Sequence, residues 1–536
     1  MNRRTFFGTA LTATLGAVVG AGSKSGELWA ATRPVGRFEW EEWSIADLQT
    51  AMDAKRLTAL ALTRKYLERI EALDRHGPNL NSVIELNPEA LAIARDLDRE
   101  RKARGRRGPL HGIPILIKDN IATHDSMSTT AGSLALCGAA PRQDAFVVQR
   151  LREAGAVILG KTNLSEWANF RSSQSTSGWS GRGGLTRNPY VLDRNPSGSS
   201  SGSGAAVAAN LCAASVGTET DGSILSPSSV NGIVGIKPTL GLVSRAGIIP
   251  IAHSQDTAGP MARSVTDAAA LLGVLAGADP RNAITGASPE KRHTDYTGFL
   301  DPHGLKGARI GVARKLFDLH PGAAKPFEEA IEAMRGLGAV IIDPIDIPST
   351  DKLGSAEMEV LLFEFKADLN AYLSGLGRGH GVQTLQDIIE FNEQNRDREM
   401  PYFGQDLMVR AQAKGPLTEG AYAEALQTCR RLSRREGIDL VMDRNQLDAL
   451  VAPTAGPAHV TDLVYGDRDI GGSTQLAAVA GYPSITVPAG FVGELPVGLS
   501  FFGRAYSEPI LLKVAFAFEV GTRVRRPPRF LPSSTG

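Results

Sequence analysis

The sequence predicts an α/β fold, in which buried strands alternate with helices. Ile113 to Ile117 is an uncharged apolar run of the length expected for a buried strand. Further along, Asp144 to Ala154 has apolar residues at helical spacing, Gly155 ends that pattern, and Ala156 to Leu159 is another short apolar run. A helix followed at once by a strand is the repeating unit of α/β proteins.

The composition is that of a large globular protein, and it excludes several classes of function. The chain has 536 residues, of which 42% are hydrophobic and 21% are charged, so a sizeable core is expected. The 58 basic and 57 acidic residues leave a net charge of +1, which favours neither nucleic acid nor an anionic membrane. The three scattered cysteines, Cys137, Cys212 and Cys429, exclude a disulfide framework and a cysteine-rich metal site.

The first residues have the pattern of a twin-arginine export signal. Arg3 and Arg4 precede an uncharged stretch from Thr5 to Ser23. The alternative is a membrane anchor, but glycine and threonine dilute the stretch, and it is marginal for spanning about 30 Å of hydrocarbon. We therefore expect residues 1–31 to be the signal, with the mature chain starting near Ala31. The protein is then periplasmic or secreted, and it makes no membrane contact after signal removal.

The mature chain is predicted to begin with helices and then to enter the sheet. Ser44 to Asp47 has the form of a capping box, and apolar positions at helical spacing follow from Leu48 to Leu73. The basic run Arg101 to Arg107 has no interleaved aromatics, so it is interpreted as a solvated loop rather than a nucleic-acid site. Lys118, Asp119 and Asn120 end the first predicted strand, where α/β enzymes often place functional groups.

The rest of the chain is predicted to complete one domain, residues 32–536. The Ser/Gly-rich stretch 172–204 is interpreted as a structured loop, because a small-residue helix is expected at Ala205 to Ala214. Residues 325–435 have a helical pattern and the most charge, so we expect a helical insertion there. Two later apolar runs are predicted to be strands that rejoin the sheet: Leu447 to Val451 and Pro483 to Val487.

Two short motifs formally match known functional patterns. Gly155 to Thr162 fits the phosphate-binding loop, but a helix precedes its first glycine and the residues between its glycines are themselves the predicted strand. Gly198 to Gly202 fits G-x-S-x-G and nominates Ser200 as a hydrolase nucleophile, with His253 or His459 as its base. Turn residues, including two prolines, precede that motif in place of the required buried strand, so we disfavour both readings.

Other motif matches carry little weight. S-x-x-K occurs twice in polar stretches near prolines, at Ser288 to Lys291 and at Ser349 to Lys352, and is a common pattern. No ligand spacing such as H-E-x-x-H is present, so the sequence predicts no metal site.

Three blocks together resemble the amidase signature family in composition and order. They are a lysine at a strand end followed by Asp-Asn, a Ser/Gly loop, and a Gly-Thr-x-Thr turn: Lys118 to Asn120, Ser197 to Gly204, and Gly217 to Ile224. The resemblance extends over most of the chain through Gly160 to Glu166, Gly232 to Thr239 and Gly481 to Pro488. It implies a large twisted mixed β-sheet covered by helices on both faces, without metal, cofactor or obligate partner subunit.

Within that family the chain is similar to the bacterial peptide amidases. Three stretches support this closer match: Ser165 to Phe170, Ser177 to Ser180, and Ser254 to Pro260. The resemblance implies hydrolysis of the C-terminal carboxamide of peptides, releasing ammonia and the free acid. The chain departs from the wider family at Ser197 and Ser201, where glycines are usual, at Asp221 in place of glycine, and at Leu225 in place of arginine.

The resemblance also implies a Ser-Ser-Lys mechanism and assigns its residues. Ser223 would be the nucleophile, Ser199 would relay protons after a cis Gly198–Ser199 peptide bond, and Lys118 would be the base. The backbone N–H groups of the turn would form the oxyanion hole: Thr220, Asp221, Gly222 and Ser223. A lysine is a base only when neutral, so burial must lower its pKa from about 10.4. Adjacent strand residues point to opposite faces, so Asp119 should not pair with Lys118.

Two alternatives to peptide amide hydrolysis remain. One is the same chemistry on small amides or esters, since the channel to Ser223 cannot be read from the sequence. The other is a binding protein on this fold without turnover. A role in an assembly for tRNA-dependent amidation is disfavoured by the export signal, because that chemistry is cytoplasmic.

Overall fold

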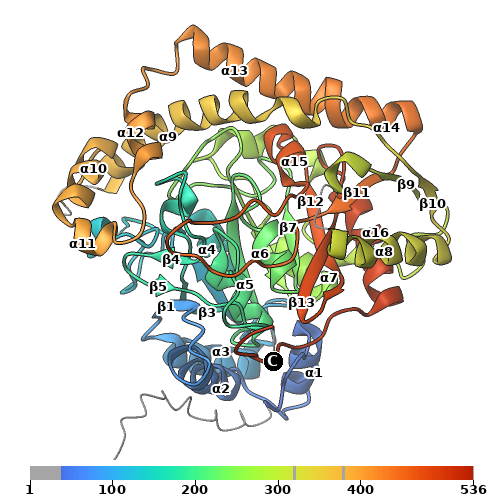
Figure 1. Ribbon diagram of the computed structural model, residues 1–536. Coiled ribbons are helices and arrows are strands. Elements are labelled where there is room, and N and C mark those ends of the chain that lie inside the picture. The colour runs from blue at the N-terminus through green and yellow to red at the C-terminus, as the bar shows by residue number, and fades with distance from the viewer. Residues whose placement is uncertain (1–37, 140, 318–320, 377–380, 535–536) are drawn as a thin grey trace, which may run out of the picture. The chain divides into compact units, whose positions relative to one another are not determined.

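Eleven strands pair into one mixed sheet at the centre of the computed structural model (Figure 1). In spatial order they are β1 (Val83–Leu86), β3 (Val157–Thr162), β2 (Pro114–Lys118), β6 (Ala214–Glu219), β8 (Thr257–Ala262), β7 (Val234–Lys237), β12 (Ser484–Val492), β13 (Leu495–Phe502), β11 (Ala449–Pro453), β9 (Arg309–Val312) and β10 (Val340–Ile342). β2 runs parallel to both β3 and β6, whereas β8 is antiparallel to β6 and β7. A two-stranded ribbon, β4 (Trp179–Ser180) and β5 (Gly184–Leu185), lies apart from this sheet. The prediction of a large mixed sheet is confirmed.

The structure describes residues 38–139, 141–317, 321–376 and 381–534. The export signal predicted for residues 1–31 and the mature start near Ala31 lie outside these ranges and stay predictions. Within the described ranges, no helix combines the length and the apolar character needed to cross a bilayer.

Both faces of the central sheet are covered. Every residue of β2, β3, β6 and β11 is buried, and successive strand residues point to opposite faces. Helix α5 (Ser201–Ala208) packs on β2, β3 and β6. At the other half of the sheet, β12 contacts α6 (Leu225–Val230), α8 (Ala324–Gly336) and α16 (Glu508–Thr522). Helix α7 (Val265–Leu275) packs on β8 and α16.

The first predicted helical stretch forms two helices, α1 (Ile45–Asp53) and α2 (Ala59–Ile70). The capping box at Ser44 is present, and Thr58 caps the second helix with its own side chain, which explains the break between them. Helix α3 (Ala90–Arg104) follows. The prediction of a loop for the whole basic run was wrong, because residues 101–104 form the end of this helix. Ion pairs to Asp53 and Glu100 neutralise part of the run.

The small-residue helix lies earlier than predicted. Helix α5 begins at Ser201 and ends at Ala208, whereas the sequence indicated a helix from Ala205 to Ala214. Asn210 has a φ of 56° and terminates the helical path, and Ala214 already belongs to β6. By contrast, α4 (Phe146–Glu153) and the strand after it lie within a few residues of their predicted positions.

A group of helices occupies one side of the molecule. They are α9 (Gly354–Leu376), α10 (Leu385–Gln394), α11 (Arg396–Glu399), α12 (Asp406–Gln412), α13 (Gly420–Arg430) and α14 (Asp439–Asn445). α9 and α13 pack side by side there, in yellow and orange in Figure 1. The segment 325–435 is mostly helical but also supplies strand β10 to the sheet. Helix α15 (Thr474–Ala480) packs against α13.

Candidate active site

Lys118 ends strand β2, and its side chain is completely buried. Its Nζ donates to Ser199 Oγ at 2.7 Å, to Thr218 Oγ1 at 2.9 Å and to the Thr218 carbonyl oxygen at 3.3 Å. Burial lowers the pKa of Lys118 to about 7, although the charges of Glu219 and Asp256 oppose the shift. A substantial neutral fraction is therefore available near neutral pH, as a lysine base requires.

Asp119 does not pair with Lys118, although it is the next residue. Its carboxylate lies on the opposite side of the strand, where it accepts hydrogen bonds from the Thr130 hydroxyl and the Gly132 N–H. Arg182 forms an ion pair with it at 3.3 Å. The expectation from strand alternation is confirmed.

The loop that carries Ser199 approaches its neighbours closely. The Gly198–Ser199 peptide bond is cis, as the resemblance implied. A Cβ on Gly198 would overlap the Ser165 hydroxyl, so only glycine fits at this position. The Ser199 carbonyl accepts from the Ser165 N–H at 3.1 Å. These contacts fix Ser199 against Lys118.

Ser223 lies in the turn after β6, beside the loop that carries Ser199. The Ser200 N–H donates to the Ser223 carbonyl at 3.1 Å, so the two serine segments are joined through their backbones. The Ser223 residue is 7% exposed. The structure thus brings Lys118 and Ser199 into direct contact and holds the Ser223 segment beside them.

The turn from Thr220 to Ser223 is held on several sides. Glu219 accepts from the N–H groups of Ile224 and Leu225 at 2.7 and 3.0 Å. The Thr220 hydroxyl donates to Asp256 Oδ1 at 2.6 Å. Gly222 has a φ of 74°, which a residue with a side chain adopts only under strain. Because the oxyanion donors of this turn would be backbone groups, its shape matters more than its side chains.

Four residues of this region were missed by sequence reasoning: Asp256, Gln255, Glu357 and Gln475. Asp256 is buried and accepts from Thr220 and from two backbone N–H groups, and burial raises its pKa to about 7. Gln255 and Asp256 lie in a stretch already noted for its resemblance, but nothing in the sequence indicated what they touch. Glu357 and Gln475 come from α9 and α15, far along the chain, and had no sequence signal.

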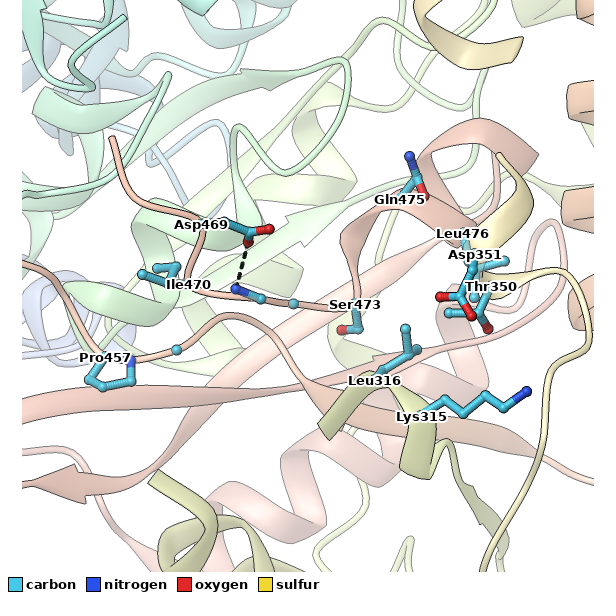
Figure 2. A pocket seen from close by; sticks show the side chains of 13 residues that line it. Lys315, Leu316, Thr350, Asp351, Pro457, Asp469, Ile470, Ser473, Gln475 and Leu476 are labelled. Carbon is cyan, nitrogen blue, oxygen red and sulfur yellow. Dashed lines mark hydrogen bonds between the residues drawn. The ribbon is translucent and has the colours of Figure 1, made fainter. Parts of the chain in front are cut away.

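Two cavities lie near the turn, and Ser223 lines neither of them. One of about 10 Å³ is lined by Ser199, Thr218, Thr220 and Asp256, and it is far too small for a substrate. The other, of about 880 Å³, is here called the polar cleft (Figure 2). It is lined by Lys315, Leu316, Thr350, Asp351, Gly456, Pro457, residues 469–473, Gln475 and Leu476.

The polar cleft lies next to the turn through helix α15. A Cβ on Gly222 would lie 3.1 Å from the hydroxyl oxygen of Thr474, and the residues on either side of Thr474 line the cleft. Figure 2 shows Lys315 and Asp351 on one side of the cleft and Pro457 and Ile470 on the other. The cleft and the turn are therefore separated by Thr474, and Lys118, Ser199 and Ser223 do not line the cleft.

The alternative motif readings receive no support from the structure. The Ser200 hydroxyl is buried and donates to the Thr218 carbonyl at 3.1 Å. Among the described residues it makes no hydrogen bond to His253 or His459, which lie beside Asp368 and Asp467 respectively. In the phosphate-loop pattern, residues 157–162 are strand β3, so no flexible loop is present to bind phosphate.

Comparison with known proteins decides the family. A family model described as Amidase matches residues 61–512. The chain belongs to the amidase family. This amidase has 52% identity to a crystal structure of native peptide amidase from Stenotrophomonas maltophilia, with a TM-score of 0.89 over 92% of this chain and 100% of that chain. The predicted resemblance, the fold and the amide-hydrolysing activity are thereby confirmed.

More distant relatives span similar lengths. A probable amidase of Arabidopsis thaliana is 45% identical over 503 residues, covering 92% of this chain and 93% of the relative. One component of the glutamyl-tRNA(Gln) amidotransferase of Carboxydothermus hydrogenoformans is 36% identical over 501 residues, covering 90% of this chain and 98% of the relative. Over most of its length the chain therefore matches one relative named as an amidase and one named as part of an amidotransferase.

Proposed function

We propose that this amidase hydrolyses the C-terminal carboxamide of peptides, with Ser223 as nucleophile, Ser199 as proton relay and Lys118 as base. The observation that carries the proposal is the buried Lys118 side chain, whose Nζ lies 2.7 Å from the Ser199 hydroxyl oxygen. A buried lysine without an adjacent carboxylate partner can lose its proton near neutral pH. The 52% identity to a peptide amidase supports the choice of substrate.

The reaction would proceed through an acyl-enzyme. Ser223 Oγ attacks the carboxamide carbon while its proton passes to Ser199, and the Ser199 proton passes to Lys118. The backbone N–H groups of Thr220, Asp221, Gly222 and Ser223 stabilise the developing oxyanion. The C–N bond then breaks, Ser199 protonates the leaving nitrogen to give ammonia, and Lys118 returns a proton to Ser199.

Deacylation would use the same groups. Water attacks the Ser223 ester, its proton passes through Ser199 to Lys118, and Ser223 regains its hydrogen as the free acid leaves. One water is consumed and one ammonia and one carboxylic acid are formed, so the steps balance.

The size of the polar cleft favours peptides over small amides. At about 880 Å³ it lies near the upper end of the range for pockets that bind drug-sized ligands, about 300–1,000 Å³. A small aliphatic amide would leave most of it empty. Hydrolysis of small amides or esters by the same residues, and ligand binding without turnover, are the alternatives that the assay must separate.

Ammonia release from an N-acetyl dipeptide amide tests the proposal. Wild type, Ser223→Ala and the surface control Ser374→Ala are compared as purified single chains, with propionamide as a second substrate. We expect release by wild type and Ser374→Ala only, with the peptide amide as the better substrate. Equal release by Ser223→Ala would overturn the nucleophile. Release from propionamide alone would overturn the peptide substrate.

We also propose that the amidase acts outside the cytoplasm, on the strength of Arg3, Arg4 and the uncharged stretch after them. The experiment is fractionation of cells expressing wild type or a double variant, Arg3→Lys with Arg4→Lys. We expect mature enzyme in the periplasm or medium only for wild type. Undiminished export of the double variant would contradict the twin-arginine route.

A further inference from the structure

Glu357 lies on helix α9. Its side chain is buried beside the turn of residues 220–223, here called the oxyanion turn. Its two carboxyl oxygens accept hydrogen bonds from two glutamines of different segments. Gln255 Nε2 lies 2.9 Å from Glu357 Oε1, and Gln475 Nε2 lies 2.7 Å from Glu357 Oε2. One carboxyl group thus joins the loop before β8, helix α9 and helix α15.

The contact through Gln255 reaches the oxyanion turn. The same Gln255 Nε2 lies 3.3 Å from the carbonyl oxygen of Thr220. That carbonyl and the Asp221 N–H belong to one planar peptide group, so fixing the direction of one fixes the direction of the other. Gln255 therefore orients the Asp221 N–H, one of the proposed oxyanion donors, and Glu357 holds Gln255 in place.

The contact through Gln475 reaches the polar cleft. Gln475 lines the cleft, and Figure 2 shows its side chain next to Leu476 at the start of α15. Because its amide nitrogen is directed at Glu357, its oxygen is the end that can accept a hydrogen bond from a substrate N–H. Thr474, the residue before Gln475, has its hydroxyl oxygen 3.1 Å from the position of a Cβ on Gly222 and so connects the cleft wall to the turn.

We propose that Glu357 is a positioning residue, which links the wall of the polar cleft to the oxyanion turn by holding Gln475 and Gln255 on its two carboxyl oxygens. The proposal rests on the proposed function, because it assigns the oxyanion role to that turn. It predicts that Glu357 affects kcat through Gln255 and the KM of peptide amides through Gln475. A small amide, which does not extend along the cleft, should show only the effect on kcat.

The protonation state of Glu357 offers a signature that a purely structural role lacks. Burial and the neighbouring charge of Asp221 raise the pKa of Glu357 to about 8. The other titratable groups near this pair are Glu219 at the end of β6, Cys429 on α13 and Lys237 on β7. Above that pH, Glu357 adds a negative charge beside a turn that must bind an oxyanion, so kcat/KM should fall.

The test compares Glu357→Gln, Glu357→Ala and the control Glu359→Gln. Glu359 lies on the same helix but pairs with Lys414 at 2.6 Å, outside the catalytic and binding machinery. Steady-state kinetics are measured on the N-acetyl dipeptide amide and on propionamide across the pH range, with thermal unfolding of each variant. Glutamine keeps the shape of a protonated carboxyl group, and its one oxygen can still accept from Gln255, whereas its amide nitrogen cannot accept from Gln475.

We expect Glu357→Gln to keep kcat within about threefold of wild type at neutral pH and to lose the alkaline fall. Glu357→Ala should lose between about tenfold and a hundredfold in kcat on both substrates, with a further rise in KM for the peptide amide alone. The control should match wild type.

Two results would overturn the inference while leaving the proposed function intact. One is wild-type activity on peptide amides together with an unchanged alkaline fall in Glu357→Gln. The other is a folded Glu357→Ala that matches the Glu359→Gln control. If Glu357→Ala does not fold, the pH profile of Glu357→Gln alone decides. Wild type without amidase activity would instead contradict the proposed function.

Discussion

Two lysines on neighbouring strands have nearly the same burial but different surroundings. Lys118 on β2 and Lys161 on β3 are both completely buried, and burial lowers their pKa values to about 7 and about 8. Lys118 donates to the hydroxyls of Ser199 and Thr218. Lys161 donates instead to the Ile121 carbonyl at 2.6 Å and to Thr129 Oγ1 at 2.9 Å.

The difference lies in what each ammonium group touches. Lys161 ties the end of β3 to the segment after β2 and lies among carboxylates, of which Asp119 has the largest effect on its pKa. Lys118 contacts Ser199, whose loop is joined to the segment of Ser223, the proposed nucleophile. A buried lysine with a lowered pKa is therefore not by itself a sign of catalysis. Lys161 also contacts a hydroxyl, that of Thr129. The distinction is that the Ser199 hydroxyl lies on a loop joined to the segment of Ser223, the proposed nucleophile.

Replacing each lysine with methionine should separate the two roles most strongly. Lys118→Met should lower kcat/KM by about a hundredfold to ten-thousandfold, because the proposed general base is lost. Lys161→Met should keep kcat within about threefold, but lower the free energy of unfolding by about 3 kcal/mol, because a buried charge network is broken. Ammonia release and urea denaturation measure the two effects. Two results would contradict the comparison. One is full activity of Lys118→Met, and the other is a Lys161→Met variant that loses activity while its free energy of unfolding is unchanged.

Removing the hydroxyl of Thr220 should lower kcat less than replacing Lys118 does. Thr220→Val keeps the backbone N–H but loses the 2.6 Å hydrogen bond to Asp256. We expect kcat to fall about tenfold, less than for loss of an oxyanion donor, because only the support of the turn is removed. Steady-state kinetics of Thr220→Val beside wild type provide the measurement, and an unchanged kcat would show that Asp256 does not support the turn.

The smallest expected effect concerns His253, a partly exposed residue of the loop before β8 that contacts helix α9. His253 contacts Asp368 at 2.9 Å and Glu364 at 3.3 Å, and the hydrogen bond to Asp368 raises its pKa. A raised folded-state pKa stabilises the protein below the unfolded value of about 6.5, and this contribution is lost as the pH rises through the folded pKa.

We therefore expect His253→Gln to lower the free energy of unfolding by about 1 kcal/mol or less at pH about 6, and by less at pH about 9. Urea denaturation of both proteins at the two pH values measures this. A larger loss at the higher pH would contradict the assigned role of the ion pair. Catalysis should be unaffected, in contrast with Lys118→Met.

Much of the fold could be predicted because local patterns agree with it. The strand ending at Lys118 and the helix and strand around Gly155 follow from short apolar runs and a glycine stop. The helix starting at Ser201 was misplaced, because serine and glycine carry little helical signal and its end depends on Asn210. Strands β7 and β8 gave no separate signal, since pairing with distant strands defines them.

The candidate site could be predicted only in part. Its three proposed catalytic residues lie in recognisable blocks, and their assignment came from resemblance. The supporting residues could not be found in this way, because their roles depend on contacts between distant segments. Gln255 meets Glu357 across 102 positions, and Glu357 meets Gln475 across 118. Only the packing of α9 and α15 beside the turn reveals these contacts.

The pH dependence of kcat/KM for peptide amide hydrolysis tests the central claim most directly, since it reports the ionisation of the free enzyme. If neutral Lys118 is the base, kcat/KM should rise with pH through an apparent pKa of about 7, and Lys161→Met should leave that rise in place. A rise centred near the ordinary lysine pKa of about 10.4, or no rise at all, would contradict the account.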